Sequence, residues 1–403
     1  VRGRMLSTTT AIIHWDGPEE ANGQVVGYRV YYTDDNTLQV NQWEKLMVRG
    51  ANFITIQSLT PNKTYYIRVL AFTSVGDGPL SQDLQIIAKT GVPSQPSDFK
   101  GEAKSETSIL LSWVAPPQSG PENLITGYEL VYRRSDDNEE KKLNFDPTSS
   151  YLMKNLKPFS SYTFQLAARS KHGIGAYTNE VTIDTPQTQP SAPPQEVTCS
   201  SPSSTSILVS WAPPLAEFQN GIITGYSIQY SVTEGDNRTS QRVSDIPPES
   251  SQYLLENLEK WTEYGITVRA LTEAGEGPES LQLLVRTEED VPSGPPRDVE
   301  TEALNSSAVR VVWRAPAVER QHGQVRGYQV HYVKMNYGEP TGPNLIKDIL
   351  IDDSQWEYNE STEYEVVLGE LQADTAYSVS VGAYTAKGDG ARSKPQTLCT
   401  TLA

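Results

Sequence analysis

The chain has 403 residues, of which 37% are hydrophobic and 21% are charged, so it can build packed cores and is not a disordered polyampholyte. The net charge is −17 and the sequence shows no basic footprint of the kind that a nucleic-acid-binding protein needs. The strong negative charge also argues against binding to anionic membrane surfaces. Tyrosine is abundant (21 residues) and phenylalanine scarce (7), which favours strands joined by turns.

The first predicted strand recurs about every hundred residues and carries an apolar residue fourteen positions before a tryptophan. These apolar residues are Val1, Phe99, Val197 and Val299. Position 1 already matches this strand, and only the proline linker that precedes the other copies is missing. We therefore expect the chain to be a segment cut at a domain edge from a longer protein.

The second predicted strand of each repeat ends on that tryptophan, and the tryptophans are spaced by 98, 98 and 102 residues. Apolar residues alternate before it, as in Ile109, Leu111 and Trp113. A period of two predicts a strand with one buried face. The tryptophans are therefore predicted core residues: Trp15, Trp113, Trp211 and Trp313.

Two tyrosine motifs follow in each repeat. A Gly-Tyr pair opens a strand such as Tyr28, Val30 and Tyr32, and a later Leu-x₅-Tyr spacing opens an alternating strand that ends on alanine. The second spacing predicts a tyrosine corner, in which the phenol hydroxyl bonds to backbone a few residues upstream. The predicted corner tyrosines are Tyr65, Tyr162, Tyr264 and Tyr377.

Glycines and prolines mark the turns and linkers. A Gly-x-Gly pair begins five residues after each alanine, and we expect its first glycine to supply a positive φ for a tight turn. The pair lacks the third glycine of a dinucleotide fingerprint and follows strands rather than opening helices. Pro-Ser-x-Pro segments between repeats predict short, semi-rigid linkers. The pairs begin at Gly76, Gly173, Gly275 and Gly388, and the linkers at Pro93, Pro190 and Pro292.

Together these features predict an all-β chain of four tandem fibronectin type III modules, which are immunoglobulin-like Greek-key β-sandwiches, in an extended rod. A single early tryptophan, a tyrosine corner and the absence of a cysteine pair argue against antibody-type domains. The predicted modules span residues 1–91, 92–188, 189–290 and 291–403.

The fourth module is longer than the others. Its Gly-Tyr and corner tyrosines are 49 residues apart, against 37, 34 and 38 in the others, which places an insertion around 335–363 that includes Trp356. The insertion could be a binding loop or an enlarged hairpin with its own small cluster. The sequence favours neither.

No catalytic, metal-binding or cofactor-binding arrangement is predicted. Cys199 and Cys399 are too far apart in sequence for a disulfide framework or zinc spacing, and neither is followed by the arginine of a phosphatase loop. We expect both thiols to be buried and inert. The four histidines have no partner at metal spacing: His14, His172, His322 and His331.

Four Asn-x-Ser/Thr sequons fall in predicted turns, where a glycan could be carried. A chain this rich in asparagine, serine and threonine would have about that many by chance. They support an extracellular location only weakly. The candidate glycosylation sites are Asn62, Asn237, Asn305 and Asn359.

Several sequence stretches resemble those of the LAR-type receptor protein tyrosine phosphatases. They occur in the same order and extend along the whole chain. One such string is Leu258-Glu-Lys-Trp-Thr-Glu-Tyr264. The chain resembles the second to fifth fibronectin repeats of that family's ectodomain. The other matching strings span residues 69–79, 145–151, 289–297, 321–328 and 387–395.

The resemblance implies an extracellular glycoprotein segment of a single-pass plasma-membrane receptor that acts in cell adhesion, axon guidance and synapse formation. The expected partners are cell-surface or matrix proteins and proteoglycans, bound mostly through domains outside this segment. It implies no catalysis here, because the phosphatase domains would also lie outside. We expect no nucleic acid, no small-molecule substrate, and membrane attachment only through the parent's transmembrane helix.

Two alternatives stay open at the level of the repeats. One is another neural adhesion molecule with stacked fibronectin repeats. The other is an intracellular elastic scaffold of the giant muscle type, which would carry no sugar at Asn62 or Asn237.

Overall fold

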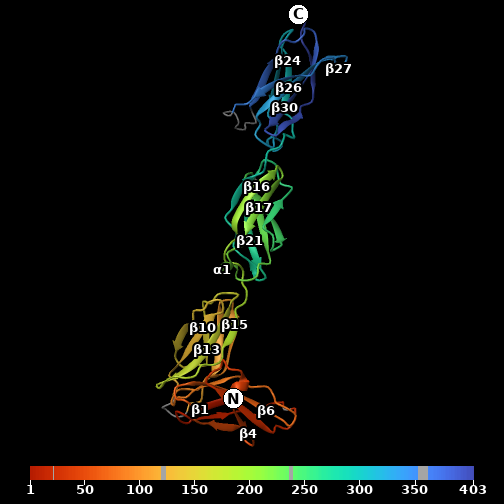
Figure 1. Cartoon of the computed structure of the whole chain (residues 1–403). Coiled ribbons are helices and arrows are strands. Elements are labelled where there is room, and N and C mark those ends of the chain that lie inside the picture. The colour runs from red at the N-terminus through yellow and green to blue at the C-terminus, as the bar shows by residue number, and fades with distance from the viewer. Residues whose placement is uncertain (21, 119–123, 236–238, 353–361) are drawn as a thin grey trace. The chain divides into compact units, whose positions relative to one another are not determined.

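The computed structural model describes residues 1–20, 22–118, 124–235, 239–352 and 362–403 (Figure 1). It divides into two compact units, one of residues 1–188 with 220–222 and the other of residues 189–219 with 223–403. Repeats 1 to 4 are named below by their predicted bounds. In each repeat, antiparallel strands form two sheets with a hydrophobic cluster between them, as the alternating sequence predicts.

Repeat 1 has a three-stranded and a four-stranded sheet. The first has the order β1-β2-β5, made of Arg2–Met5, Ala11–His14 and Phe53–Ile56. The second has the order β4-β3-β6-β7, made of Glu44–Val48, Gly27–Thr33, Thr64–Phe72 and Leu84–Ile87. A short 3₁₀ helix, η1 (Val40–Gln42), precedes β4.

Repeat 2 repeats this plan with a longer second sheet. Its first sheet has the order β12-β9-β8: Ser150–Met153, Ser108–Val114 and Ser97–Ser105. Its second has the order β11-β10-β13-β14, with β15 also paired to β13: Lys141–Phe145, Gly127–Arg134, Ser161–Ser170, Gly173–Ile174 and Val181–Asp184.

Repeat 3 has the same two sheets and one short helix, α1 (Ala216–Gln219). Its first sheet has the order β16-β17-β20: Gln195–Ser203, Ser206–Ala212 and Gln252–Leu255. Its second has the order β19-β18-β21-β22, with β23 on β21: Gln241–Ile246, Gly225–Val232, Glu263–Thr272, Gly275–Glu276 and Leu283–Arg286.

Repeat 4 has the largest sheet. Its first sheet has the order β24-β25-β29: Arg297–Ala303, Val309–Arg314 and Glu363–Leu368. The six-stranded sheet consists of β27 (Glu339–Pro340), β26 (Gly327–Asn336), β30 (Ala376–Thr385), β31 (Gly388–Arg392), β28 (Leu345–Leu350) and β32 (Gln396–Cys399). A 3₁₀ helix, η3, spans Val318–Arg320.

The recurring tryptophans lie between the sheets and anchor each core. They are at most 5% exposed, and each ring centroid lies 5.2–5.4 Å from that of the Gly-Tyr tyrosine of the same repeat. Such aromatic contacts stabilise a core beyond the burial of area alone. The tryptophans are Trp15, Trp113, Trp211 and Trp313.

A tyrosine corner is present in every repeat. The hydroxyl of each buried corner tyrosine accepts a hydrogen bond from the backbone N–H five residues upstream, over 2.7–2.9 Å. The donors are Thr60, Lys157, Glu259 and Gln372, and the acceptors are Tyr65, Tyr162, Tyr264 and Tyr377.

The two glycines of each Gly-x-Gly pair have different roles. The first has a positive φ in repeats 2 to 4, of 127° at Gly173, 141° at Gly275 and 132° at Gly388. The same expectation for Gly76 is wrong. In repeat 1 the strand β6 ends at Phe72, which bridges to Asp77, so Gly76 lies in a wider turn that needs no left-handed residue.

The second glycine makes room for the linker that precedes its own repeat. A Cβ added at Gly175, Gly277 or Gly390 would clash with the linker proline. The prolines concerned are Pro93, Pro190 and Pro292. The linkers are therefore packed against the repeat that follows them.

Candidate functional surfaces

Two of the four candidate glycosylation sites lie in the described part of the chain, and both are exposed in turns. Asn62 has a φ of 66° just before β6, and its backbone N–H donates to the Ala88 carbonyl over 2.9 Å. Asn305 accepts through Oδ1 from the backbone N–H and hydroxyl of Ser307, its own sequon serine, at 2.8 and 3.2 Å. Asn237 and Asn359 lie outside the described residues.

The two cysteines differ in environment. Cys199 on β16 is half-buried against the core of repeat 3, and burial raises the pKa of its thiol to about 11. Cys399 on β32 is exposed, so the expectation that it is buried is wrong. The strand alternation turns Leu398 toward the core of repeat 4, and this leaves its neighbour Cys399 on the solvent face.

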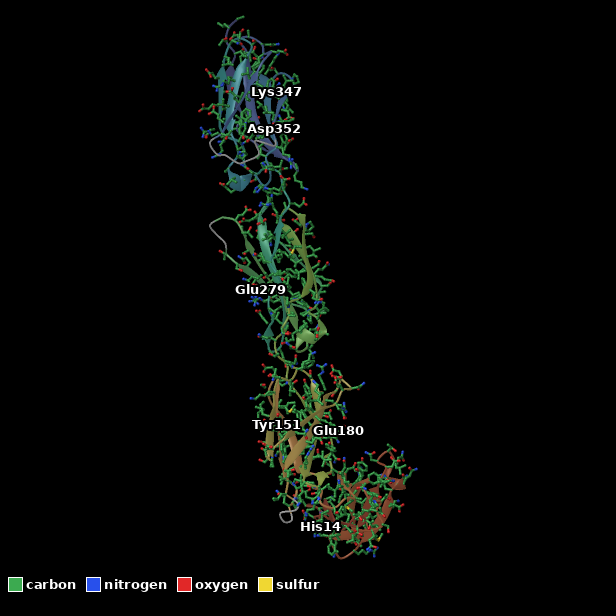
Figure 2. All side chains as sticks on the ribbon, turned by 90° about the vertical axis from the view of Figure 1, so that its left-hand side faces the viewer. His14, Tyr151, Glu180, Glu279, Lys347 and Asp352 are labelled. Atoms are coloured by element: carbon green, nitrogen blue, oxygen red, sulfur yellow. The ribbon has the colours of Figure 1, made fainter. Side chains whose placement is uncertain are left out.

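The four histidines lie in separate surroundings. His14 on β2 is half-buried in repeat 1 (Figure 2), and His172 is exposed in the β13–β14 turn. His322 lies beside the linker into repeat 4, and His331 lies on β26. No group of three or more metal-ligating side chains lies close together in the part of the chain that the structure describes.

The linker between repeats 3 and 4 is held by both of its neighbours through Asp290. Lys260 of repeat 3 forms an ion pair with the Asp290 carboxylate at 2.7 Å and lowers its pKa. The Asp290 N–H donates to the His322 carbonyl over 2.7 Å, and its carbonyl accepts from the Thr385 hydroxyl over 2.8 Å. This linker is therefore a docked segment, as expected of a semi-rigid connection.

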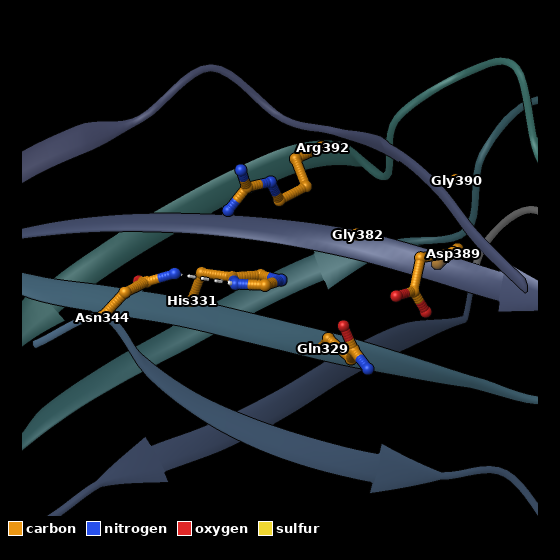
Figure 3. Close-up of a pocket in the computed structure, with 8 residues that line it drawn as sticks. Gln329, His331, Asn344, Gly382, Asp389, Gly390 and Arg392 are labelled. Carbon is orange, nitrogen blue, oxygen red and sulfur yellow. Dashed lines mark hydrogen bonds between the residues drawn. The ribbon is translucent and has the colours of Figure 1, made fainter.

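A shallow pocket of about 270 Å³ lies on the outer face of the large sheet of repeat 4 (Figure 3). His331, Asp389 and Arg392 face it, and Asn344 Nδ2 donates to His331 Nδ1 over 3.5 Å. Burial, and secondly the charge of Arg392, lower the pKa of His331. The lining is polar, so the pocket can hold a small polar group.

A glycine in the middle of a strand opens this pocket. Gly382 pairs with Gln329 across β26 and β30. The corresponding residues of repeats 1 to 3 are Leu70, Ala167 and Arg269, which all carry a side chain there. A glycine within a strand marks a bulge or a close approach, and the pairing of β30 with β31 does shift register beside Gly382.

The described part of the predicted insertion 335–363 forms an extended hairpin, and Ile349 and Ile351 near the end of this part pack into the core of repeat 4. Strand β26 turns at Tyr337 and Gly338, which have φ values of 50° and 78°, and β27 returns beside its end (Figure 1). Tyr337 is 99% exposed and Leu350 on β28 is 76% exposed. Trp356 lies outside the described residues, so whether the insertion is a binding loop or a hairpin with its own cluster stays open.

Most side chains on β28 of this hairpin are exposed on the surface of repeat 4. Lys347, on β28, and Asp352, which follows the strand, are both exposed (Figure 2). Apolar side chains are exposed beside them on the same strand, namely Leu345 and Ile346. The hairpin therefore presents mixed charged and apolar groups to solvent.

Repeat 1 carries an aromatic and basic surface that the sequence analysis missed. A second cluster, made of Tyr31, Trp43, Leu70 and Phe72, packs on the outer face of its four-stranded sheet. Lysine and arginine side chains lie over these rings: Arg29 and Arg49 over Phe72, Lys45 over Tyr31 and Arg68 over Trp43. The net charge of the whole chain hides this surface. Strand register brings these residues together.

No helix in the described ranges is both long and apolar enough to cross a membrane.

Comparison with known proteins gives one family match that recurs along the chain. The model of the fibronectin type III domain matches residues 1–87, 94–184, 192–286 and 294–398. The four all-β sandwiches predicted from the repeats are thus confirmed. The exact domain bounds stay a prediction.

Curated relatives match the chain from end to end. It is 51% identical over 402 residues to "Receptor-type tyrosine-protein phosphatase F" of Homo sapiens, covering 100% of this chain and 21% of the relative. It is 38% identical over 393 residues to "Tyrosine-protein phosphatase Lar" of Drosophila melanogaster, covering 98% and 19%. The chain thus spans about a fifth of the length of these relatives, and the likeness agrees with the LAR-type resemblance of its strings.

Proposed function

The chain belongs to the fibronectin type III domain family, and on that premise we propose that it is an extracellular spacer and ligand-interaction segment of a LAR-type receptor tyrosine phosphatase. The observation that carries the proposal is the unbroken similarity through all four repeats, including the long fourth one. Two unrelated chains of fibronectin modules would be similar only at the framework residues of each module. Here the match covers the whole chain without a missing repeat.

The proposed role is to hold and present binding surfaces in cell adhesion, axon guidance and synapse formation. The described surfaces supply exposed hairpins, edges and a polar pocket for partners. Phosphatase catalysis, and most binding of cell-surface proteins, matrix proteins and proteoglycans, would belong to domains outside this segment. We also propose that the exposed Asn62 and Asn305 carry N-linked glycans, with Asn237 and Asn359 as further candidate sites.

The first test is antibody staining of this segment on intact and permeabilised source cells. We expect signal on intact cells, with an antibody against a cytoplasmic protein as the control for membrane integrity. Signal that appears only after permeabilisation would refute the receptor proposal and favour an intracellular scaffold.

Glycosylation is tested on material purified from the source cells. Treatment with peptide N-glycosidase in heavy-oxygen water should convert Asn62 and Asn305 to labelled aspartate, detected by peptide mass spectrometry. Unlabelled asparagine at both positions would contradict the proposed glycans.

A further inference from the structure

The strand β4 is an end strand of the four-stranded sheet of repeat 1, so one of its sides offers backbone groups that no strand of this sheet pairs (Figure 1). Lys45 lies opposite Tyr31 and Met47 opposite Arg29, both on the outer face, while Leu46 and Val48 turn to the core. By the same alternation Arg49 follows on the outer face. The edge therefore displays a basic, an apolar and a basic side chain in turn.

The two cations of this row are held by aromatic rings and not by acids. Lys45 Nζ lies 5.7 Å from the Tyr31 ring centroid, and Arg49 Cζ lies 6.0 Å from that of Phe72. Neither forms an ion pair with any described residue, and Met47 between them is 54% exposed. Stacking on a ring restrains a long side chain, so less entropy is lost when a partner binds it.

On the corresponding edge strand of each other repeat at least one polar side chain already has a partner, and the counterpart of Lys45 in repeat 2 is Lys142, opposite Val131. Asn144 on β11 accepts from Arg169, Arg242 on β19 pairs with Glu276, and Asp348 on β28 accepts from the Tyr384 hydroxyl. Edge lysines often serve only to prevent aggregation. That role does not require the arrangement seen on β4. There Lys45 and Arg49 form no ion pair with a described residue, lie over aromatic rings and flank the exposed Met47.

Charge is also distributed unevenly along the chain. Residues 1–91 contain eight basic and eight acidic residues, whereas residues 189–290 contain five basic and fifteen acidic ones. Repeat 1 is thus the part of this acidic chain that repels an acidic partner least.

We propose that β4 of repeat 1 is a docking edge for an extended acidic segment of a partner protein, which adds a strand to the sheet. Residues directly opposite each other on neighbouring strands share a face, so the partner's side chains meet Lys45, Met47 and Arg49 in turn. The segment should carry two acidic residues four positions apart, about 13 Å along a strand, with an apolar residue midway. This inference does not depend on the receptor proposal, because it concerns only surfaces of this chain.

The test uses the full 403-residue chain and a synthetic peptide, Thr-Glu-Thr-Val-Thr-Glu-Thr, with Thr-Lys-Thr-Val-Thr-Lys-Thr as the control peptide. Binding is measured calorimetrically at low salt, and amide hydrogen exchange is followed in residues 44–49. We expect the acidic peptide to bind and slow exchange in that strand, and the basic peptide to do neither. Absence of binding, equal binding of the two peptides, or protection elsewhere would overturn the proposal.

Matched variants separate this edge from general electrostatics. Lys45→Glu with Arg49→Glu should weaken peptide binding at least tenfold, and Lys45→Gln with Arg49→Gln offers a milder pair if the first variant fails to fold. Lys141→Glu with Lys142→Glu makes the same charge change on an edge strand of repeat 2 and should leave binding unchanged. An equal loss in the repeat 2 variant would mean that net charge, and not this edge, governs the binding.

Discussion

A hydrogen bond to each corner tyrosine helps to hold the turn before it. In repeat 3 the Tyr264 hydroxyl accepts from the Glu259 N–H over 2.8 Å, and the tyrosine is only 5% exposed. Removing the hydroxyl leaves a partly buried N–H without its partner. Leaving a buried N–H without a partner lowers the free energy of unfolding by more than an average hydrogen bond contributes to it.

Tyr264→Phe is therefore expected to destabilise repeat 3 by about 1–3 kcal/mol. Hydrogen exchange of the repeat 3 core measures this change. Tyr253→Phe is the matched control, because Tyr253 is 37% exposed in the same repeat and should have little effect. Equal stability of the two variants would contradict the role of the corner.

The two thiols give a second prediction at the scale of single residues. Burial raises the pKa of Cys199 to about 11, so at pH 8 only about a thousandth of it is the reactive thiolate. Cys399 is exposed. We expect iodoacetamide at pH 8 to modify Cys399 at least tenfold faster, as followed by peptide mass spectrometry, and Cys199 to react faster as the pH rises toward 11. Similar rates at both sites would show that Cys199 is not shielded.

At the scale of elements, the strand β31 and the linker that leads into repeat 4 are packed together. A Cβ at Gly390 would clash with Pro292, whereas nothing lies within 4 Å of a Cβ at Gly76, where φ is not positive. Gly390 is the second glycine of its pair and has a packing role, whereas Gly76 is the first glycine of its pair and has none.

Gly390→Ala should therefore destabilise the linker junction by about 1–3 kcal/mol, as expected for overpacking. Faster hydrogen exchange in residues 289–293 would report it. Gly76→Ala is the matched control and should be neutral or slightly stabilising, because alanine restricts the unfolded chain. An unchanged junction in Gly390→Ala would show that the linker moves away without cost.

At the scale of the whole molecule, each repeat has its own core, so core damage should stay local. Trp→Ala in a core costs about 3–5 kcal/mol, against a domain stability of about 5–15 kcal/mol. We expect Trp211→Ala to expose repeat 3 to hydrogen exchange and spare repeats 1, 2 and 4. Trp261→Ala is the control, since Trp261 is 36% exposed in the same repeat. Thermal unfolding of Trp211→Ala that matched the parent would contradict the core assignment.

The extended rod stays a prediction from the proline linkers. Small-angle scattering of the full chain should give a maximum dimension of about 120–150 Å, from four sandwiches with strands of about 8–10 residues placed end to end. A compact particle would contradict it.

The sequence by itself determined the repeats, the buried tryptophans, the corner tyrosines and the family. These features depend on local periodicity and on short spacings, which one strand or turn expresses alone. Alternation even places Val197 and Cys199 on one face. For Cys399, no apolar residue two positions away was used to show which face of the strand is buried. The prediction that Cys399 is buried was therefore wrong.

Which side chains lie together on the surface was decided only by the tertiary structure. The clash of Gly390 with Pro292, the pocket opened by Gly382, and the row of Lys45, Met47 and Arg49 over Tyr31 and Phe72 each join residues from different strands or segments. Such groupings depend on which strands are neighbours and in which register, and a shift of one residue would turn every side chain to the opposite face. Neither the net charge nor the spacing of residues along one strand tells which strands are neighbours or in which register they pair. The row on β4 could therefore be recognised only in the three-dimensional structure.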